Sequence, residues 1–513
     1  MALTSCGRYH AEAHLTTHEP RRDALVRSIP STPLLIQTNH GTVPGMSYQL
    51  PRLSSDSREL ELAFRAAVGD LLGNVQPWTD GRGTTRDCLL AGLHYDRPWT
   101  RDATINSWNG VSLIWPSLAR ATLESVLIQD KHGLRIGGQY WDAIIWASGA
   151  WNHYLVTGDR EFLKRAFDAT RTSLAFFDER ELDPADGLYR GGACFMDGIS
   201  GYPEFYLNPD WNSGIPGWAD RHPDIRHPTG EGFPAKTLST NLLYMNAWRL
   251  LPEMAAELDY EIQEEWTDRT VKLRSAVREA FWDSGSGRLR YLVDPWGGCD
   301  RQEGLGWAFA VLFGLLTDEE AAALPVRAHI TAHGIPSLWP DYERYAGADS
   351  PARYGRHGAT VWPHINAFWA DACVAAGSRE AGWRELEMLA GKAVRDGHFS
   401  EIYHPDTGRR YGGEQEDSSV KAIRTWRSEP RQSWCASGFI RMVTSVLFGL
   451  KPARDGLSFA PWLPAGLNRV AFSGLEYHGH PLELELCRQD DPQQVELTIN
   501  ATRWDGRSFK PGR

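Results

Sequence analysis

Cysteine is scarce in this chain and shows no pairing pattern. The seven cysteines among 513 residues are scattered, their number is odd, and no Cys-x-x-Cys pair occurs. Disulfide-stapled secreted domains carry dense cysteine frameworks, so we expect reduced thiols and a cytoplasmic protein. The first thirty residues hold charges, histidines and prolines in place of an apolar segment, so we expect no secretion signal.

Long apolar runs and basic stripes are also missing. No run of eighteen apolar residues occurs, so we expect no membrane-spanning helix and no membrane partner. The net charge is −11 and no Lys/Arg stripe is present, which argues against nucleic acid as a partner. Hydrophobic residues make up 42% and charged residues 23%, as in an ordinary globular protein with a sizeable core. The sequence leaves the oligomeric state open.

Several signatures of catalysis do not occur. The seventeen histidines lack His-Glu-x-x-His spacing, and cysteine and histidine do not cluster, so we expect no metal. The Gly-x-Ser-x-Gly elbow of serine hydrolases is absent. Neither Gly-x-Gly-x-x-Gly nor a phosphate-binding loop is present, so we expect no cofactor.

Tryptophan, in contrast, is abundant. The chain has 22 tryptophans beside 17 tyrosines and 18 phenylalanines. Indole and phenol rings combine a flat apolar face with a polar edge, and sugar rings stack on such faces. About half of these tryptophans are expected in the core, and others lie in polar loops where packing explains them less well.

Helical periodicity dominates from about residue 57 to 450. Apolar residues recur three and four positions apart in ten segments: 58–72, 112–128, 140–157, 160–177, 240–258, 260–281, 305–316, 361–376, 379–394 and 434–450. Long loops rich in Gly, Pro, Trp and Asp separate them, and loops of such length are usually functional. We therefore expect a helical scaffold that carries a site in the loops at one end.

The pattern of apolar and polar residues changes after residue 452. Residues 482–486 and 494–499 alternate apolar and polar side chains, which predicts short strands. The expected organisation is an irregular N-terminal arm (1–55), a helical catalytic domain (56–451) and a small β segment (452–513).

A candidate catalytic carboxylate lies in the segment 400–408, Ser-Glu-Ile-Tyr-His-Pro-Asp-Thr-Gly. A Pro/Gly turn holds Glu401 beside Tyr403, and a Gln-Ser-Trp-Cys segment containing Trp434 then opens an apolar run. These segments resemble glycoside hydrolase family 63, whose Glu-x-Tyr-Asn-Pro-x-Thr-Gly turn precedes a Phe-Ser-Trp helix. The resemblance implies an (α/α)6 barrel and an inverting glycosidase, with Glu401 as general base and Tyr403 and Trp434 at the substrate.

Inverting hydrolysis needs a second carboxyl group as general acid, on the other side of the scissile bond. The best candidate is Asp197, because its Met-Asp-Gly-Ile-Ser-Gly-Tyr-Pro context is similar to the Met-Asp-Asn-Ser-Pro-Arg loop of family 63. Apolar neighbours would raise the pKa of this carboxyl group and keep its proton available. Glu204 stands where that family has arginine, which leaves the substrate open. Asp210 and Glu204 are the rival acids, and Glu204 is also a candidate substrate contact.

Two further segments combine a tryptophan with charged side chains. Arg-Pro-Trp-Thr-Arg-Asp offers the Trp99 ring, the Arg101 donor fork and the Asp102 acceptor, which suit sugar hydroxyls. Similar segments in debranching-type and family 63 enzymes line the pocket for the cleaved sugar. A salt-bridged helix start is the alternative for this segment. Trp141 and Asp142 begin the next helix, where Asp142 contacts a sugar or complements the helix dipole.

Residues 353–366 resemble a third motif of family 63. Arg-Tyr-Gly-Arg-His-Gly-Ala-Thr-Val-Trp-Pro-His-Ile-Asn is similar to its Tyr-Trp-Arg-Gly-Pro-x-Trp-x-x-Ile-Asn segment, and debranching enzymes carry a related Tyr-His-Asn-Gly-Thr-Val-Trp-Pro. The resemblance implies that Trp362 is a stacking platform and that Arg356 or His357 binds a hydroxyl group.

The resemblance to family 63 implies an exo-acting, inverting glycoside hydrolase that cleaves an α-glucoside or a related α-glycoside. The expected partner is an oligosaccharide or a small glycoside. A cellobiose-phosphorylase-like enzyme, a sugar epimerase using His364 and His404, and a non-catalytic sugar-binding barrel are the alternatives.

Overall fold

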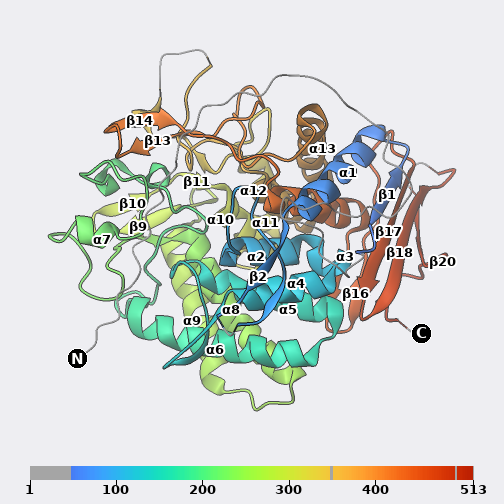
Figure 1. The fold of residues 1–513 in the computed structure, drawn as a ribbon, viewed down its shortest axis with the longest axis horizontal. Helices are drawn as coiled ribbons and strands as arrows, with labels where there is room; N and C mark the ends of the chain where they lie inside the picture. The colour runs from blue at the N-terminus through green and yellow to red at the C-terminus, as the bar shows by residue number, and fades with distance from the viewer. Residues whose placement is uncertain (1–47, 82, 347–350, 492–493, 512–513) are drawn as a thin grey trace. The chain divides into compact units, whose positions relative to one another are not determined.

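The computed structural model describes residues 48–513 apart from 82, 347–350, 492–493 and 512–513 (Figure 1). The predicted N-terminal arm, 1–55, lies mostly outside the described residues. The described chain is mainly helical and has a small β region toward its C-terminus, as predicted. Within this part of the chain, no helix is both long enough and apolar enough to cross a membrane.

Six helices of the described chain form an inner set. Their sequences carry small or apolar residues on most sides, which is typical of a buried helix. α12, for example, buries twelve of its 13 residues. The inner helices are α2 (Thr100–Asn106), α5 (Trp146–Thr157), α8 (Leu238–Glu257), α10 (Gly304–Leu312), α12 (Pro363–Ala375) and α14 (Ser433–Met442). Each contacts the next in this order, and α14 also contacts α2, so the series of contacts returns to its start.

Amphipathic helices alternate with the inner ones along the chain. They are α1 (Arg58–Gly73), α4 (Pro116–Ser125), α6 (Arg160–Glu181), α9 (Glu264–Phe281), α11 (Asp318–Arg327) and α13 (Arg379–Asp396). Side-chain caps fix several of their starts, such as Asp159, which accepts a hydrogen bond from the backbone N–H of Phe162 at 2.9 Å. α1 contacts α14, α6 contacts α5 and α8, and α13 contacts α12, so each covers inner helices.

Short helical segments complete the connections. Two are π-helices, η1 (Ser107–Val111) and η6 (Val443–Phe448), which continue α2 and α14. The others are α3 (Ser112–Ile114), α7 (Trp218–Arg221), η2 (Ala143–Ile145), η3 (Ile199–Gly201), η4 (Glu204–Tyr206) and η5 (Glu343–Tyr345).

An antiparallel sheet forms the C-terminal region. Its order is β1-β17-β18-β19-β20, with β1 (Arg52–Ser55), β17 (Arg469–Tyr477), β18 (His480–Arg488), β19 (Val495–Ile499) and β20 (Thr502–Arg503). In β18, three leucines are buried and alternate with glutamates, as the sequence pattern predicts. Leu53 of β1 pairs with Phe472 of β17, so this early strand joins the C-terminal sheet (Figure 1, blue beside red).

The remaining strands form small antiparallel hairpins and ladders between the helices. They are β2 (Val75–Thr79), β3 (Thr85–Leu89), β4 (Leu127–Asp130), β5 (Gly133–Ile136), β6 (Lys236–Thr237), β7 (Trp282–Asp283), β8 (Arg288–Leu289), β9 (Leu292–Asp294), β10 (Gly297–Cys299), β11 (Gln302–Glu303), β12 (Leu338–Trp339), β13 (Glu414–Asp417), β14 (Ala422–Thr425), β15 (Lys451–Ala453) and β16 (Gly456–Ser458).

The expected helices are confirmed with one clear exception. The segment 112–128 is not one helix, because the chain turns at Trp115 before Pro116 begins α4. Its last residues, Leu127 and Ile128, belong to strand β4. Two observed helices were not among the predicted segments. They are the short α2 and α11, which contains Pro325.

The predicted site residues lie near the N-terminal ends of inner helices. Trp99 directly precedes α2, Asp142 precedes η2 and α5, Trp362 precedes α12, and Trp434 is in the first turn of α14. The loops that join these helices therefore bring residues from distant parts of the sequence to one end of the inner set.

Candidate active site

The loop that carries Asp197 is fixed by its backbone. Asp142 accepts a hydrogen bond from the N–H of Phe195 at 2.8 Å. The Tyr202 hydroxyl accepts from the N–H of Ala193 at 2.9 Å and donates to the carbonyl oxygen of Met196 at 2.7 Å. Because these bonds hold the residues on both sides of the turn, the Asp197 side chain has a defined direction.

Asp197 lies among polar and charged groups. Its Oδ2 accepts hydrogen bonds from Arg101 Nη2 at 3.1 Å and Gln139 Nε2 at 3.2 Å. Its Oδ1 lies 3.7 Å from His357 Nε2, and its side chain is 37% exposed. Burial acts to raise the pKa of Asp197, but the positive charge of Arg101 and the other contacts outweigh it, so this pKa lies below its usual value.

The sequence-based expectation of a raised pKa at Asp197 is therefore wrong. The apolar side chains next to it, Phe195 and Met196, are buried in the core. Arg101 is 96 residues distant in sequence and provides the dominant favourable charge. Burial lowers the pKa of His357 to about 3, so this imidazole is neutral near pH 7 and adds no full charge.

Glu401 lies in a second turn, which has its own set of hydrogen bonds. It is 3% exposed, and its Oε2 accepts a hydrogen bond from Arg356 Nη2 at 2.8 Å. The backbone N–H of Glu401 donates to the carbonyl oxygen of Glu429 at 2.8 Å, and Tyr403 forms a β-bridge with Val361. These bonds fix the turn of 400–408 against the segment that leads into α12.

Two consecutive residues connect the candidate acid and base. Arg356 binds Glu401, and the next residue, His357, lies against Asp197. Arg356 Nη1 donates to the carbonyl oxygens of Gly412 and Arg427 at 3.0 and 3.2 Å, which fixes the guanidinium group. The segment Arg356–His357 therefore contacts both carboxyl groups, Glu401 through Arg356 and Asp197 through His357.

Asp102 adds a third carboxyl group to this end of the molecule. Burial raises its pKa to about 7 against the lowering effect of Arg101, and the charges of Glu401 and Asp197 raise it further. Its Oδ1 is buried and has no hydrogen-bond partner among the described residues. An unpaired buried acceptor suits a ligand hydroxyl or a water molecule at this position.

Two site residues were missed at the level of sequence. Burial and the charges of Glu401 and Asp102 raise the pKa of Tyr95, so its phenol stays protonated beside these carboxyl groups. Gln139 donates directly to Asp197. Tyr95 lies four residues before Trp99, and Gln139 lies two before Trp141, so proximity to the recognised motifs is the signal that could have found them.

Several predicted substrate contacts are buried supports in this structure. Trp362 is 2% exposed, its Nε1 donates to the carbonyl oxygen of Arg356 at 2.9 Å, and the His357 ring stacks on it at 5.2 Å. Trp141 donates to the carbonyl oxygen of Ala193 at 3.1 Å. The expectation that Trp362 offers a free stacking face is therefore wrong, since protein groups already cover the ring.

Tyr403 and Trp434 are also buried. The Tyr403 hydroxyl accepts from the N–H of Ser400 at 3.0 Å, which stabilises the Glu401 turn. Trp434 is 4% exposed, stacks on His364 at 4.2 Å, and has no partner for its Nε1 among the described residues. Trp99 is only half-buried at the start of α2, so it has the most accessible indole of the predicted set.

Asp142 positions its neighbours. It is 1% exposed, burial raises its pKa to about 6, and Arg101 Nη1 lies 3.3 Å from its Oδ2. It thus binds both the Asp197 loop and the arginine that pairs with Asp197.

The rival acids, Asp210 and Glu204, are exposed side chains. Asp210 is exposed, accepts from the N–H of Asn212 at 3.1 Å and pairs with Arg221 at 3.2 Å, as a turn-forming surface aspartate does. Glu204 is exposed in the short helix η4. Among the described residues, no group of three or more His, Cys, Asp or Glu side chains could hold a metal ion.

Comparisons with known proteins agree with this geometry. A family model described as "Mannosylglycerate hydrolase MGH1-like glycoside hydrolase domain" matches residues 143–434, more than half of the chain, including Asp197 and Glu401. A second model, described as "Glycosyl hydrolase family 65, C-terminal domain", matches residues 450–500. No curated protein matches the chain.

Solved structures show a related fold. A protein named "Sialidase" gives a TM-score of 0.64 at 14% identity over 88% of this chain, and the family 78 rhamnosidase of a Bacillus species gives 0.56 at 15% over 88%. The chain spans 40% and 41% of the lengths of these two proteins. Family 63 mannosylglycerate hydrolase from Thermus thermophilus, in complex with glucose, gives 0.55 at 17% over 74% of this chain and 99% of its own length.

These matches agree with the resemblance to family 63 that the sequence motifs suggested. The family model spans the helical region in which the carboxylate pair lies, and glycoside hydrolases of known structure share the fold. The chain therefore belongs to the mannosylglycerate hydrolase MGH1-like glycoside hydrolase domain family.

Proposed function

We propose that this protein is an exo-acting, inverting hydrolase of an α-glycoside, with Asp197 as general acid and Glu401 as general base. The observation that carries the proposal is the pair itself. Each carboxyl group has its own arginine partner, Arg101 or Arg356, and His357 joins the two halves of the site. We further propose that the inner and outer helices form an (α/α)6 barrel, since the contacts of the inner helices return to their start.

In the proposed reaction, Asp197 protonates the glycosidic oxygen while Glu401 takes a proton from water. The water attacks the anomeric carbon from the face opposite the leaving group, so one displacement inverts the configuration. The reaction requires the two carboxyl groups to be about 6.5–9.5 Å apart, with the water beside Glu401. Arg356 Nη2 donates a hydrogen bond to Glu401 Oε2 and so fixes the direction of this carboxylate.

Asp197 needs a proton that the free protein holds weakly. Arg101 favours the charged form before substrate binds, and 37% of the side chain is open to water. A bound sugar would replace this water and raise the pKa of Asp197 toward the range of a working acid. In a site without substrate, the geometry and protonation of an acid differ from those in the complex, so a low pKa there is compatible with the role.

The polar groups around the pair suit a sugar ring. We propose that Trp99 packs against the ring, that Asp102 accepts from a hydroxyl group, and that Tyr95 and Arg101 donate to hydroxyl or ring oxygens. Trp141, Asp142, Trp362, Tyr403 and Trp434 act one layer behind, as supports for the loops. Glu204 is proposed as a more distant contact for the aglycone.

An α-glucoside is the leading substrate. The family model is named for a mannosylglycerate hydrolase, and one similar structure is a mannosylglycerate hydrolase in complex with glucose. Rhamnosidases share the fold, and Glu204 replaces the arginine of the family 63 acid loop, so the identity of the sugar needs a panel of substrates.

Two observations disfavour the alternative reactions. A phosphorylase would need a phosphate pocket in place of Glu401, whereas this carboxylate is present and paired with Arg356. A histidine-based epimerase would need two free imidazoles. The ring nitrogens of His364 have no hydrogen-bond partner among the described residues, but His404 Nε2 lies 2.8 Å from the carbonyl oxygen of Ala352 and its Nδ1 accepts from the N–H of Asp406.

The proposal is tested with a panel of aryl glycosides of both anomers, assayed with and without phosphate and with a chelator. Hydrolysis of an α-glycoside is expected, independent of phosphate and of the chelator. Proton NMR of the first sugar released, recorded before mutarotation, should show the β-anomer. Net retention of configuration, a requirement for phosphate, or loss of activity with the chelator would overturn the proposal.

A further inference from the structure

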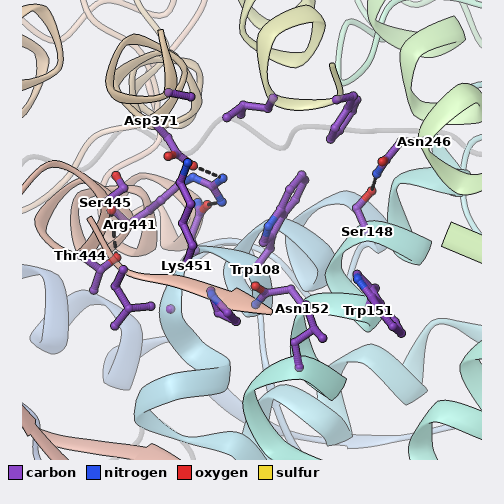
Figure 2. A pocket seen from close by; sticks show the side chains of 18 of the residues that line it. Trp108, Ser148, Trp151, Asn152, Asn246, Asp371, Arg441, Thr444, Ser445 and Lys451 are labelled. Carbon is purple, nitrogen blue, oxygen red and sulfur yellow. Dashed lines mark hydrogen bonds and ion pairs between the residues drawn. The ribbon is translucent and has the colours of Figure 1, made fainter. Parts of the chain in front are cut away.

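A cavity is lined by residues toward the C-terminal ends of inner helices, away from the helix starts that carry the candidate active site. Figure 2 shows side chains of its lining. We call it the far-end cavity; its volume is about 470 Å³, within the range of small-molecule sites. Asp371 lines it near the end of α12, eight residues beyond Pro363 at the helix start, and Arg441 lines it seven residues beyond Trp434 in α14. At 1.5 Å per residue, the helices separate the cavity from the site end by about 10–12 Å.

A buried arginine forms one wall of this cavity. Arg441 is 7% exposed and pairs with Asp371 at 2.6 Å, while its Nη1 donates to Asn109 Oδ1 at 3.4 Å (Figure 2). Its Nε has no hydrogen-bond partner among the described residues, and neither has the buried Ser445 hydroxyl beside it. An unsatisfied buried donor costs about 1–3 kcal/mol, so these groups are suited to an occupant that accepts hydrogen bonds.

The backbone around the cavity is specialised. Both π-helices of the described chain line it: η1 contributes Trp108 to Gly110, and η6 contributes Thr444 and Ser445. π-helical turns are rare and frequently lie at functional sites. Gly110 has a φ of 137°, and a Cβ there would overlap Ile440, so the turn depends on glycine at this position. The presence of two π-helices at one cavity indicates a role beyond packing.

The opposite wall is a chain of donors and acceptors. Arg249 Nη2 donates to Asn246 Oδ1 at 2.7 Å, and Asn246 Nδ2 donates to the Ser148 hydroxyl at 2.8 Å. Figure 2 shows the Asn246–Ser148 pair facing the Arg441–Asp371 pair, with the Trp108 indole between them. Amide and hydroxyl groups of this kind match the hydroxyl groups of a sugar.

The charge of the lining is positive. Arg249, Arg441 and Lys451 carry three positive charges, and among the residues that line the cavity, all of them described, Asp371 is the one acid. Arg441 already neutralises Asp371, which leaves Arg249 and Lys451, both exposed at the mouth, for a ligand. Anions bound by arginine and lysine gain charge-assisted hydrogen bonds.

We propose that the far-end cavity binds a small anionic carbohydrate, a hexose phosphate or a hexuronate. The half-buried Trp151 at the mouth offers a face for the sugar ring, the amide and hydroxyl walls bind its hydroxyl groups, and Arg249 and Lys451 bind the anion. This site is independent of the glycosidase reaction proposed above, and its ligand differs in charge from a neutral glycoside.

Isothermal titration of the full chain with glucose 6-phosphate, glucuronate, glucose and inorganic phosphate tests the proposal. Glucose 6-phosphate or glucuronate is expected to bind with a Kd below about 10 mM, at least tenfold more tightly than glucose or inorganic phosphate. The double variant Arg249→Gln/Lys451→Gln should weaken this binding at least tenfold. Asn152→Trp, which fills the mouth without a change of charge, should weaken it as well.

Two controls separate the far-end cavity from other sites. Lys131→Gln/Lys164→Gln removes two positive charges from exposed side chains that do not line the cavity, and should leave binding unchanged. Asp102→Ala, at the catalytic end, should also leave it unchanged. Absence of binding by either anionic sugar would overturn the proposal. So would binding that survives both cavity variants, binding that is lost in the Asp102→Ala protein, or equal binding of inorganic phosphate.

Discussion

Replacement of Glu401 by glutamine tests the proposed reaction most directly. The side chain is 3% exposed, and one oxygen accepts a hydrogen bond from Arg356 at 2.8 Å. A glutamine has the same shape and can present its amide oxygen to the same guanidinium group. Arg356 also keeps its bonds to the carbonyl oxygens of Gly412 and Arg427, so no buried donor is left unpaired. The fold is therefore expected to persist.

The catalytic effect should be much larger than the structural one. General-base assistance contributes about 10²–10⁴ to the rate. Since each factor of ten corresponds to about 1.36 kcal/mol, the barrier should rise by about 2.7–5.4 kcal/mol. Loss of the charge on one hydrogen bond should cost about 1–2 kcal/mol of stability, a shift of a few degrees in Tm.

The assay is turnover of the best glycoside of the panel, together with thermal unfolding followed by circular dichroism. Glu320→Gln is a matched control, because Glu320 also pairs with an arginine, Arg278 at 2.9 Å, but lies on α11. This variant should lose a similar amount of stability and keep its turnover. Turnover of folded Glu401→Gln within tenfold of the unaltered enzyme would remove Glu401 from the mechanism.

Three further predictions concern the groups around the pair. Gly198→Ala should lower kcat/KM by at least about tenfold in steady-state assays, because the new Cβ would overlap the side chains of His357 and Gln415 and shift the acid loop. Burial raises the pKa of Asp102 to about 7, so the folded protein retains a proton that the unfolded chain releases above about pH 4. This group therefore lowers stability progressively from about pH 4 to about pH 7, and the Tm of Asp102→Asn relative to the unaltered protein should rise between about pH 5 and about pH 8. The pKa of Asp197 is low in the free protein and should rise with substrate bound, so the alkaline limb of kcat should lie at higher pH than that of kcat/KM.

For each of these predictions, one result would contradict it. Gly69→Ala is the control for Gly198→Ala, because a Cβ on Gly69 meets no atom within 4 Å in α1, and equal kinetics of the two variants would refute the steric argument. A Tm difference for Asp102→Asn that stays constant between the two pH values would mean that Asp102 is ionised in the folded protein. Coincident alkaline limbs would show that substrate does not change the pKa of the acid.

Secondary structure was predictable for helices with one polar face and also for longer buried helices such as α12. The outer helices α1, α6 and α13 show clear three-and-four spacing because one side meets solvent. α2 buries all seven of its residues, including polar ones such as Arg101, so its pattern has no amphipathic signal. α11 contains a proline, which is typical of a helix end and argued against a helix there. Its first turn nevertheless carries a capping box, which is a signal for a helix start.

The candidate site was predictable as motifs, but its electrostatics were not. The turn around Glu401 and the loop around Asp197 are contiguous, so sequence identified both. The pKa of Asp197 depends on Arg101, which is distant in sequence. The apolar residues next to Asp197 in sequence predicted a raised pKa, whereas the pKa is lowered. The burial of Trp362 could not be predicted either, because the sequence does not show that the His357 ring stacks on the Trp362 ring.

The charges at the two ends of the inner helices favour different ligands. At the end that carries the candidate active site, Asp142, Asp197 and Glu401 share two guanidinium groups, those of Arg101 and Arg356, so the carboxylates outnumber their cationic partners. A negatively charged aglycone would meet an excess of like charge there, whereas a neutral glycoside only replaces water. The far-end cavity has the reverse balance. A neutral substrate at one end and an anionic ligand at the other can therefore bind the same protein without competing for one site.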